Sequence, residues 1–297
     1  MAGRDGFSGY HPGVNFLYFT LVLGFTMFVT HPAGVAVSLV SALCYQRYLN
    51  GPGAAARQLR WLGPMLVMAA ALNGLLNHRG ETALFRLPGG GAVTLESLLC
   101  GVGMAGMLWA VTAWFGCFNR VVTSDKFLYL FGRAIPALSL VLSMALGFVP
   151  KLTQRFGRVV QAQTGLGRSV TGGGVSRRVK NAVGALSILT TWTLESAVAT
   201  ADSMRSRGYG LPGRTAFSIY RFHTRDKLCA AWLLALGGFL LWAGAKGALA
   251  WQYFPRTEGA AGPLTLWAWA GYLALCLTPV ILDRKEDAQW RRLRSAV

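Results

Sequence analysis

Apolar residues occur along the chain in six long runs, separated by polar, glycine-rich or basic segments. Each run approaches or reaches the roughly 20 residues that a helix needs to cross the hydrocarbon of a bilayer. The pattern predicts six membrane-spanning helices, at residues 14–30, 33–49, 61–77, 95–118, 228–250 and 263–282. Small residues recur within them, as in GVGMAGM at 101–107. Such residues let neighbouring helices approach closely.

A seventh apolar run, AIPALSLVLSMALGF at 134–148, has Pro136 near its start and Pro150 just beyond its end. A run of about 15 residues is short for a membrane crossing and is typical of an interfacial or buried helix. We therefore expect a short helix here that ends at Pro150. It should lie at or near the inner face of the membrane.

Basic residues are concentrated in two connections, and their placement sets the orientation. Segment 151–227 carries thirteen basic residues against three acidic ones, and segment 47–60 carries three arginines and no acid. Cytoplasmic loops are enriched in Lys and Arg, so both segments should be cytoplasmic. This holds only if 134–148 does not cross the membrane. The resulting topology places both termini in the cytoplasm and 78–94 and 251–262 outside.

The region from about 127 to 227 is predicted to form two long amphipathic helices that end near residues 163 and 207. They are joined by a glycine-rich connection, TGLGRSVTGGGVSRR. In the second helix an apolar face repeats every three to four residues, at Val179, Val183, Leu186, Leu189 and Thr193. The sequence thus predicts an all-α integral membrane protein in three parts. These are four N-terminal spans (1–122), helices at the cytoplasmic face (123–227), and a C-terminal hairpin with a basic tail (228–297).

Composition supports the membrane assignment. Hydrophobic residues make up 53% of the chain, charged residues only 13%, and the mean hydropathy is +0.41. A soluble domain carries about 25% charged residues. The net charge of +18 fits cytoplasmic loops beside anionic headgroups. It does not indicate a nucleic-acid partner, because the basic residues are not interleaved with aromatic ones over a soluble fold.

The residue types that carry catalysis or ion coupling are not arranged for it in this sequence. The motifs GxxxxGK[ST] and GxSxG do not occur, and no two His or Cys residues have the spacing of metal ligands. The spans contain almost no ionisable residues, whereas ion-coupled carriers place them near the midplane. We expect a non-catalytic chain that binds no cofactor or metal. A stand-alone secondary transporter or channel is the alternative, followed by a membrane enzyme.

Residues 201–210, ADSMRSRGYG, end the second amphipathic helix with two arginines and a Gly-Tyr-Gly sequence. Arg205 and Arg207 fit two interpretations. They are snorkelling anchors at the headgroups, or they form a docking tip. Gly208 suits a helix C-terminus, where the helix dipole favours an arginine. The forked guanidinium matches carboxylates or carbonyls on a partner.

Four stretches resemble the transmembrane T component of energy-coupling factor (ECF) transporters, a prokaryotic family. They are YHPGVNFLYFTLVLGFTMFVTHP at 10–32, LNHRGETALFRLPGGGAVTLES at 76–97, TSDKFLYLFGRAIPALSLVLSMALGFVPKL at 123–152 and ESAVATADSMRSRGYGLPGRTAFSIYRF at 195–222. The resemblance extends over about residues 10–225. It implies a scaffold in the cell membrane that connects two cytoplasmic ABC-type ATPases, which bind ATP and Mg, to a membrane-embedded S component. The cargo class is vitamins or transition-metal ions such as cobalt.

The resemblance also implies site residues. Family members carry Ala-Arg-Gly-type motifs at two helix ends, which dock in the ATPases. The second motif maps onto Ser206-Arg207-Gly208, with Arg205 beside it. The first falls at Gly165-Leu166-Gly167, where Leu166 stands in place of the arginine, and we expect Arg168 to substitute for it. Apolar faces of these helices should contact the S component, with Met144, Leu146 and Phe148 as candidates.

Overall fold

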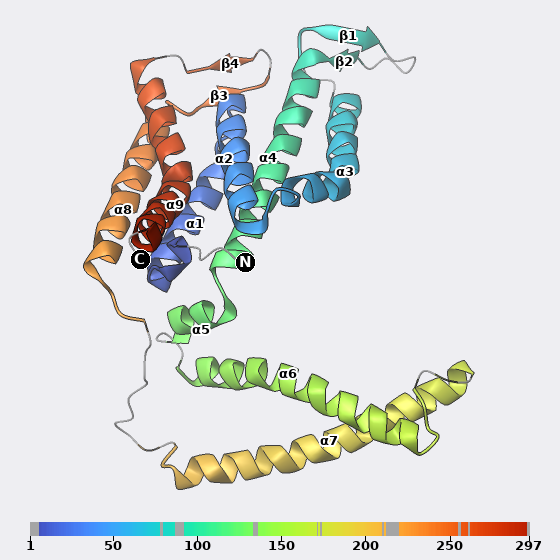
Figure 1. Cartoon of the computed structure of the whole chain (residues 1–297). Coiled ribbons are helices and arrows are strands. Elements are labelled where there is room, and N and C mark those ends of the chain that lie inside the picture. The colour runs from blue at the N-terminus through green and yellow to red at the C-terminus, as the bar shows by residue number, and fades with distance from the viewer. Residues whose placement is uncertain are drawn as a thin grey trace. The chain divides into compact units, whose positions relative to one another are not determined.

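A computed structural model describes residues 6–77, 80–86, 92–132, 136–170, 172, 174–209, 211, 220–254, 257–260 and 262–295. The described chain is mostly helical (Figure 1). A 3-10 helix, η1 (Phe7–Gly9), precedes α1 (Pro12–Phe28), α2 (Pro32–Asn50), α3 (Ala54–Leu76), α4 (Leu95–Val121), α5 (Ser124–Gly132), α6 (Pro136–Gly165), α7 (Val175–Ser206), α8 (Thr224–Ala245) and α9 (Pro263–Ser295). The contacts divide the chain into two compact units: unit 1 comprises 1–126 and 220–297, and unit 2 comprises 127–219.

Each of the six predicted spans coincides with a helix, which confirms an all-α membrane protein. By length and composition, five helices in the described residues are able to cross a membrane: α3, α4, α7, α8 and α9. Of the six predicted spans, α1 is apolar but has only 17 residues, and α2, with 19 residues, is not among the five. Helix α7, which the charge pattern assigns to the cytoplasmic face, also meets the criteria of a span. Its position at that face stays a prediction.

The prediction that a short helix ends at Pro150 is wrong. Helix α6 continues through Pro150 to Gly165 and is 30 residues long. Proline removes one backbone donor and crowds the preceding turn, which bends or breaks a helix. Here the flanking residues are good enough helix formers for the helix to propagate beyond it. Helices α3 and α9 likewise contain internal prolines, Pro64 and Pro279, and α3 is bent in Figure 1.

Two small β-hairpins, which the apolar pattern did not predict, lie in the connections assigned to the outside. Antiparallel strands β1 (Ala83–Arg86) and β2 (Ala92–Thr94) precede α4, and β3 (Trp251–Gln252) pairs with β4 (Glu258–Gly259) between α8 and α9. The β1–β2 hairpin is fixed to the start of α4 by Glu96, whose carboxylate accepts from the backbone and side chain of Thr82.

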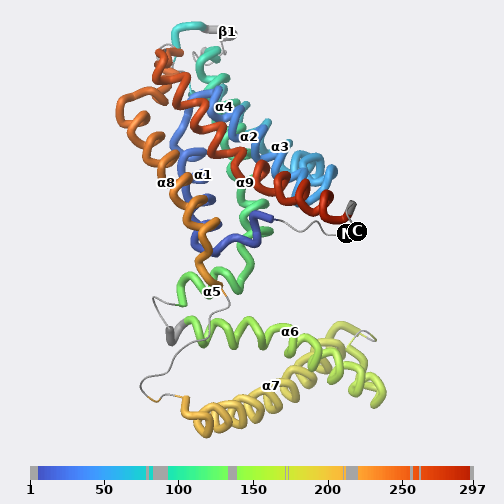
Figure 2. The backbone as a smooth tube through the Cα atoms, turned by 60° about the vertical axis from the view of Figure 1, so that its left-hand side comes forward, coloured from blue at the N-terminus to red at the C-terminus, as the bar shows by residue number. Residues whose placement is uncertain are grey.

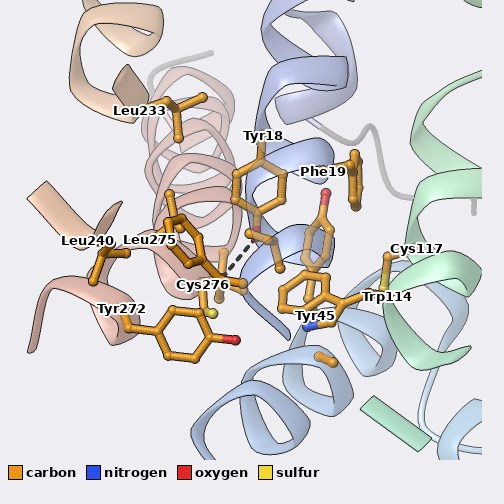
Figure 3. Packing of buried hydrophobic residues seen from close by; sticks show 14 of the residues in the cluster. Tyr18, Phe19, Tyr45, Trp114, Cys117, Leu233, Leu240, Tyr272, Leu275 and Cys276 are labelled. Carbon is orange, nitrogen blue, oxygen red and sulfur yellow. Dashed lines mark hydrogen bonds between the residues drawn. The ribbon is translucent and has the colours of Figure 1, made fainter. Parts of the chain in front are cut away.

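The core of unit 1 lies where α1, α2, α4, α8 and α9 run alongside one another (Figure 2). The rings of Tyr18, Tyr45 and Trp114 meet there beside Cys276 of α9, whose carbonyl accepts a hydrogen bond from the Tyr18 hydroxyl (Figure 3). Aromatic side chains bury large apolar areas and prefer such edge-to-face contacts. Most of the cluster is apolar, but it surrounds one polar group of side chains.

That polar group joins four helices through the Ser38 hydroxyl of α2. The indole of Trp114 on α4 donates to it at 3.0 Å, and Thr26 of α1 shares a hydrogen bond with it at 2.8 Å. Thr26 also lies 3.1 Å from the hydroxyl of Tyr272 on α9 and donates to Val22 O. Buried polar groups are costly unless paired. A paired set of this kind fixes the relative placement of the helices that supply it.

In unit 2, α6 and α7 cross as two long rods (Figure 1). Val159 of α6 is 4% exposed and Ala185 of α7 is fully buried. The small Ala185 side chain allows the helices to approach closely. Away from this contact both helices are largely exposed. The ends of the two helices, which we call tips, carry the predicted docking residues.

Candidate functional site

Both helices of unit 2 end in the same local structure. At the end of α6, Gly167 has φ +75°, its N–H bonds Thr164 O at 3.0 Å, and Arg168 N–H reaches back to Gln163 O at 2.9 Å. This 6→1 and 5→2 pair of hydrogen bonds defines a Schellman cap, in which glycine takes the left-handed position. We call residues 165–168 the first tip.

The end of α7 repeats this pattern. Gly208 has φ +78°, its N–H bonds Arg205 O at 3.0 Å, and Tyr209 N–H reaches back to Met204 O at 3.0 Å. We call residues 205–209 the second tip. The predicted residues Arg205, Ser206 and Arg207 are all exposed. Ser206 Oγ donates to Ser203 O within the last turn, so its hydroxyl remains available only as an acceptor.

Superposing the caps by their glycines aligns the two motifs residue by residue. Gly167 matches Gly208, Leu166 matches Arg207, and Arg168 matches Tyr209. Leu166 is 74% exposed, so an apolar side chain occupies the place where the second tip presents a guanidinium. Arg168 is exposed but lies two residues further along, beyond the left-handed glycine. The prediction that Arg168 substitutes for the missing arginine stays a prediction. A partner would have to approach Arg168 from a different direction than it approaches Arg207.

The first tip is braced against α7. Asn181 Nδ2 donates to Ser169 O at 2.8 Å, and Arg178 Nε donates to Val170 O at 3.3 Å. These two side chains hold the connection that follows α6. Sequence reasoning missed this role, although an Asn and an Arg one turn apart at the start of α7 face the same side of the helix. In the second tip, Leu211 N–H also bonds Gly208 O.

The three candidates for S-component contact do not share one face of α6. Met144 and Phe148 are half-buried and lie one turn apart, whereas Leu146 is exposed and about 200° around the helix from Met144. The exposed apolar stripe of α6 instead combines Leu146 with Leu142 and Val149. Their spacing of four and three residues is the signal by which the sequence could have identified this stripe. On α7, Val179, Val183 and Leu186 are exposed as well.

Among the residues with a described placement, His, Cys, Asp and Glu form no group of three that could hold a metal ion. The thiols of Cys44, Cys100, Cys117, Cys229 and Cys276 are free. The chemistry that unit 2 presents is therefore that of its two tips and its exposed apolar stripes. Those are surfaces suited to contacts with another protein or with lipid.

The fold and the tips define a class: a multi-pass helical membrane protein in which a pair of crossing helices with capped, exposed ends is inserted between α4 and α8. No family model matches the chain. Over part of its length it is similar to curated proteins of one kind.

These relatives are named energy-coupling factor transporter transmembrane protein EcfT. The one from Lactobacillus helveticus is 33% identical over 117 residues, 39% of this chain and 42% of that protein. Those of Lacticaseibacillus paracasei and Listeria innocua are 35% identical over 108 residues (36% of this chain, 41% of that protein) and 34% identical over 106 residues (35% and 40%). The chain thus spans about two fifths of the length of the curated relatives it matches. The resemblance seen in the motifs is confirmed: the chain is EcfT-like over the matched stretch.

Proposed function

We propose that this chain is the transmembrane component of an ECF-type, ATP-driven importer and that it transmits movement rather than catalysing a reaction. Two cytoplasmic ABC-type ATPases bind ATP and Mg and close on nucleotide. The tips of unit 2 dock on them, and the exposed stripes of α6 and α7 contact a membrane-embedded S component that binds a vitamin or metal ion. Both chain termini lie in the cytoplasm in this arrangement.

The observation that carries the proposal is the matched pair of capped helix ends in an EcfT-like chain. A Schellman cap terminates a helix at a defined residue, so the side chain just before the glycine leaves the helix end in a fixed direction. In the second tip this side chain is Arg207, exposed and favoured by the helix dipole. A bidentate guanidinium–carboxylate pair is the strongest contact that such a tip can offer a partner.

The direct test is co-purification of ABC-type ATPases with tagged full-length protein from membranes of the source cell, with their identity established by mass spectrometry. Removing one partner of a desolvated charge pair costs about 2–5 kcal/mol, which is about 30-fold or more in affinity. Arg207→Ala should therefore lose the ATPases. Arg284→Ala, which removes an exposed arginine of α9, is the matched control and should retain them.

The outcomes separate the candidate functions. If the wild-type protein brings down no ATPase, the coupling function is refuted, and a stand-alone secondary transporter or channel becomes the leading hypothesis. If both variants retain the ATPases, the complex stands but Arg207 is not its docking residue.

The first tip requires its own pair of variants, Leu166→Arg and Arg168→Ala. If Leu166 contacts an apolar groove, placing a charge there weakens ATPase binding and Arg168→Ala leaves it unchanged. If Arg168 replaces the missing arginine, the opposite result follows: Arg168→Ala weakens binding. The structure favours the first outcome, because Leu166 and not Arg168 occupies the cap position of Arg207.

A further inference from the structure

Residues 6–11, which we call the N-terminal strap, are held by charged side chains from three other helices of unit 1. The strap itself contains no charged residue; it reads Gly-Phe-Ser-Gly-Tyr-His. Its backbone provides the partners. Phe7 N–H donates to Asp283 Oδ1 at 2.6 Å, and His11 N–H donates to Asp226 Oδ1 at 3.2 Å.

The backbone carbonyls of the strap accept hydrogen bonds from positively charged side chains. Lys126 Nζ donates to Ser8 O at 2.6 Å and to Ser8 Oγ at 3.0 Å, and Arg225 Nη2 donates to Gly9 O at 3.3 Å. Two N–H groups therefore meet carboxylates and two C=O groups meet cations, over five consecutive residues. Charged partners make the strongest hydrogen bonds to backbone groups.

Lys126 is deeply placed for a lysine, with 6% of its surface exposed. Besides the two atoms of Ser8, its ammonium donates to Val121 O at 2.9 Å, at the carboxyl end of α4. The amide of Asn15, in the orientation that pairs both its atoms, accepts from Lys126 at 3.2 Å and donates to Phe7 O at 2.9 Å. Partners on every side satisfy the three donors of the ammonium, which is the condition for burying it.

The strap is packed as well as hydrogen-bonded. Phe7 is fully buried against Tyr18, with ring centroids 5.2 Å apart. The imidazole of His11 packs at a tilt against the ring of Phe222, with centroids 4.5 Å apart. At Gly6, a side chain would collide with the carboxylate of Glu286, because an added Cβ would lie 1.9 Å from its Oε2.

Two of the side chains that hold the strap, Lys126 and Asp226, lie close to the points where the chain leaves unit 1 and returns to it. Lys126 is the last residue before unit 2, near the start of α5, and the chain re-enters unit 1 at Tyr220, just before Arg225 and Asp226. We call 124–126 the α5 root and 220–228 the α8 root. Asp226 is 1% exposed and also accepts from His223 N–H at 2.8 Å, which fixes the first turn of α8.

We propose that the N-terminal strap ties the α5 root to the α8 root, so that the two chain connections to unit 2 respond to a load as one element. Lys126 and Asp226 are its positioning residues. The tie itself follows from the contacts within unit 1. Its use in passing movement between unit 2 and the membrane helices rests on the proposed function.

The test is hydrogen exchange of the full chain in lipid nanodiscs, followed by mass spectrometry of peptides covering 6–11, 124–130 and 224–230. Lys126→Met removes the α5 anchor. Asp226→Asn, which is isosteric, removes one charge from the α8 anchor. Losing a charged hydrogen bond should speed exchange by about tenfold in the peptide that loses it. The tie predicts a reciprocal effect: Lys126→Met also speeds exchange in the α8 root, and Asp226→Asn in the α5 root.

Controls separate a tie from ordinary loss of stability. Lys285→Met removes an exposed lysine of α9 and should leave all three peptides unchanged. Asp125 of the α5 root and Tyr220 of the α8 root also interact directly: burial raises the pKa of Tyr220, and the Asp125 carboxylate raises it further. Tyr220→Phe tests whether this direct contact, rather than the strap, couples the two roots. If Lys126→Met does not fold, Arg225→Gln removes an exposed anchor and should give a smaller effect, about threefold, at 124–130.

Effects confined to the mutated root would overturn the proposal, and so would a Tyr220→Phe variant that reproduced the reciprocal effect. These exchange experiments use no ATPase, so their outcome is independent of the proposed function. With ATPases bound, trapping with ATP and vanadate should change the protection of both roots together in the wild type. In Asp226→Asn it should change only one root. Independent changes in the wild type would refute the mechanical role while leaving the docking function intact.

Discussion

The cap of the second tip offers a way to change the docking geometry without touching the docking side chain. In Gly208→Ala, Arg207 is intact, but an alanine must adopt φ +78°. The left-handed conformation costs a non-glycine residue about 1–2 kcal/mol. Sterics add little, because the new Cβ would lie 3.3 Å from the flexible end of Leu211. The population of the intact cap should therefore fall by about 5- to 30-fold relative to its frayed form.

Two observables follow from this loss. The amides of Gly208 and Tyr209, which bond Arg205 O and Met204 O, should exchange faster by the same factor in the isolated protein. ATPase binding should weaken by up to that factor, because Arg207 must then be ordered at the moment of docking. Gly208→Asn is the matched variant, since asparagine tolerates the left-handed region, and should show a smaller effect.

One combination of results would show that the cap does not present Arg207 to the ATPase. If Gly208→Ala exchanges faster but binds ATPases like the wild type, while Arg207→Ala does not bind, then the charge matters and its presentation by the cap does not. Gly167→Ala provides the same test at the first tip, where an added Cβ meets nothing within 4 Å and φ is +75°.

Two further predictions concern unit 1. Ser38→Ala leaves the buried indole N–H of Trp114 without its acceptor. It should lower the free energy of unfolding in mixed micelles by about 1–3 kcal/mol. If the effects of Ser38→Ala and Trp114→Phe simply add in the double variant, the hydrogen bond between the two side chains contributes nothing. Burial lowers the pKa of His11 below its ordinary 6.5, against a smaller opposite effect of Asp226, and its neutral Nδ1 accepts from Gly13 N–H at the start of α1. The stability that His11 contributes is thus present above pH 6.5 and is lost as the pH falls through the lower pKa of His11 in the folded protein. His11→Asn should flatten this pH dependence of the free energy of unfolding while keeping the helix cap.

The features that sequence predicted are those with a local cause. Apolar runs located the helices of unit 1 because each run is long enough to form a helix and to need burial or lipid on most sides. Gly208 marked the end of α7 because only glycine enters the left-handed region without strain. The position of Arg207 at that end followed directly. Such features depend on neighbours within a few residues.

The features that sequence did not predict depend on context or on distance. Pro150 is a helix breaker by itself, yet α6 continues through it to Gly165. The strap left no pattern at all, since its partners bind backbone atoms, which every residue has. Its hydrogen bonds join residues 215 and 276 positions apart, and nothing local distinguishes Asp226 or Asp283 from an ordinary surface acid.

The strap also has a consequence for how the protein is made. The strap is synthesised before two of the carboxylates that hold it, because Asp226 and Asp283 follow 215 and 276 residues behind their partners. At about 5–20 residues per second, the strap waits about 10–50 s for them.

During that time α1 to α4 are in place and the whole of unit 2 is synthesised. Lys126 can bind the strap before that time, but the strap gains its full set of charged partners only when α8 and α9 arrive. A nascent chain stalled before α8 should have residues 6–11 more accessible to a protease than the finished protein has.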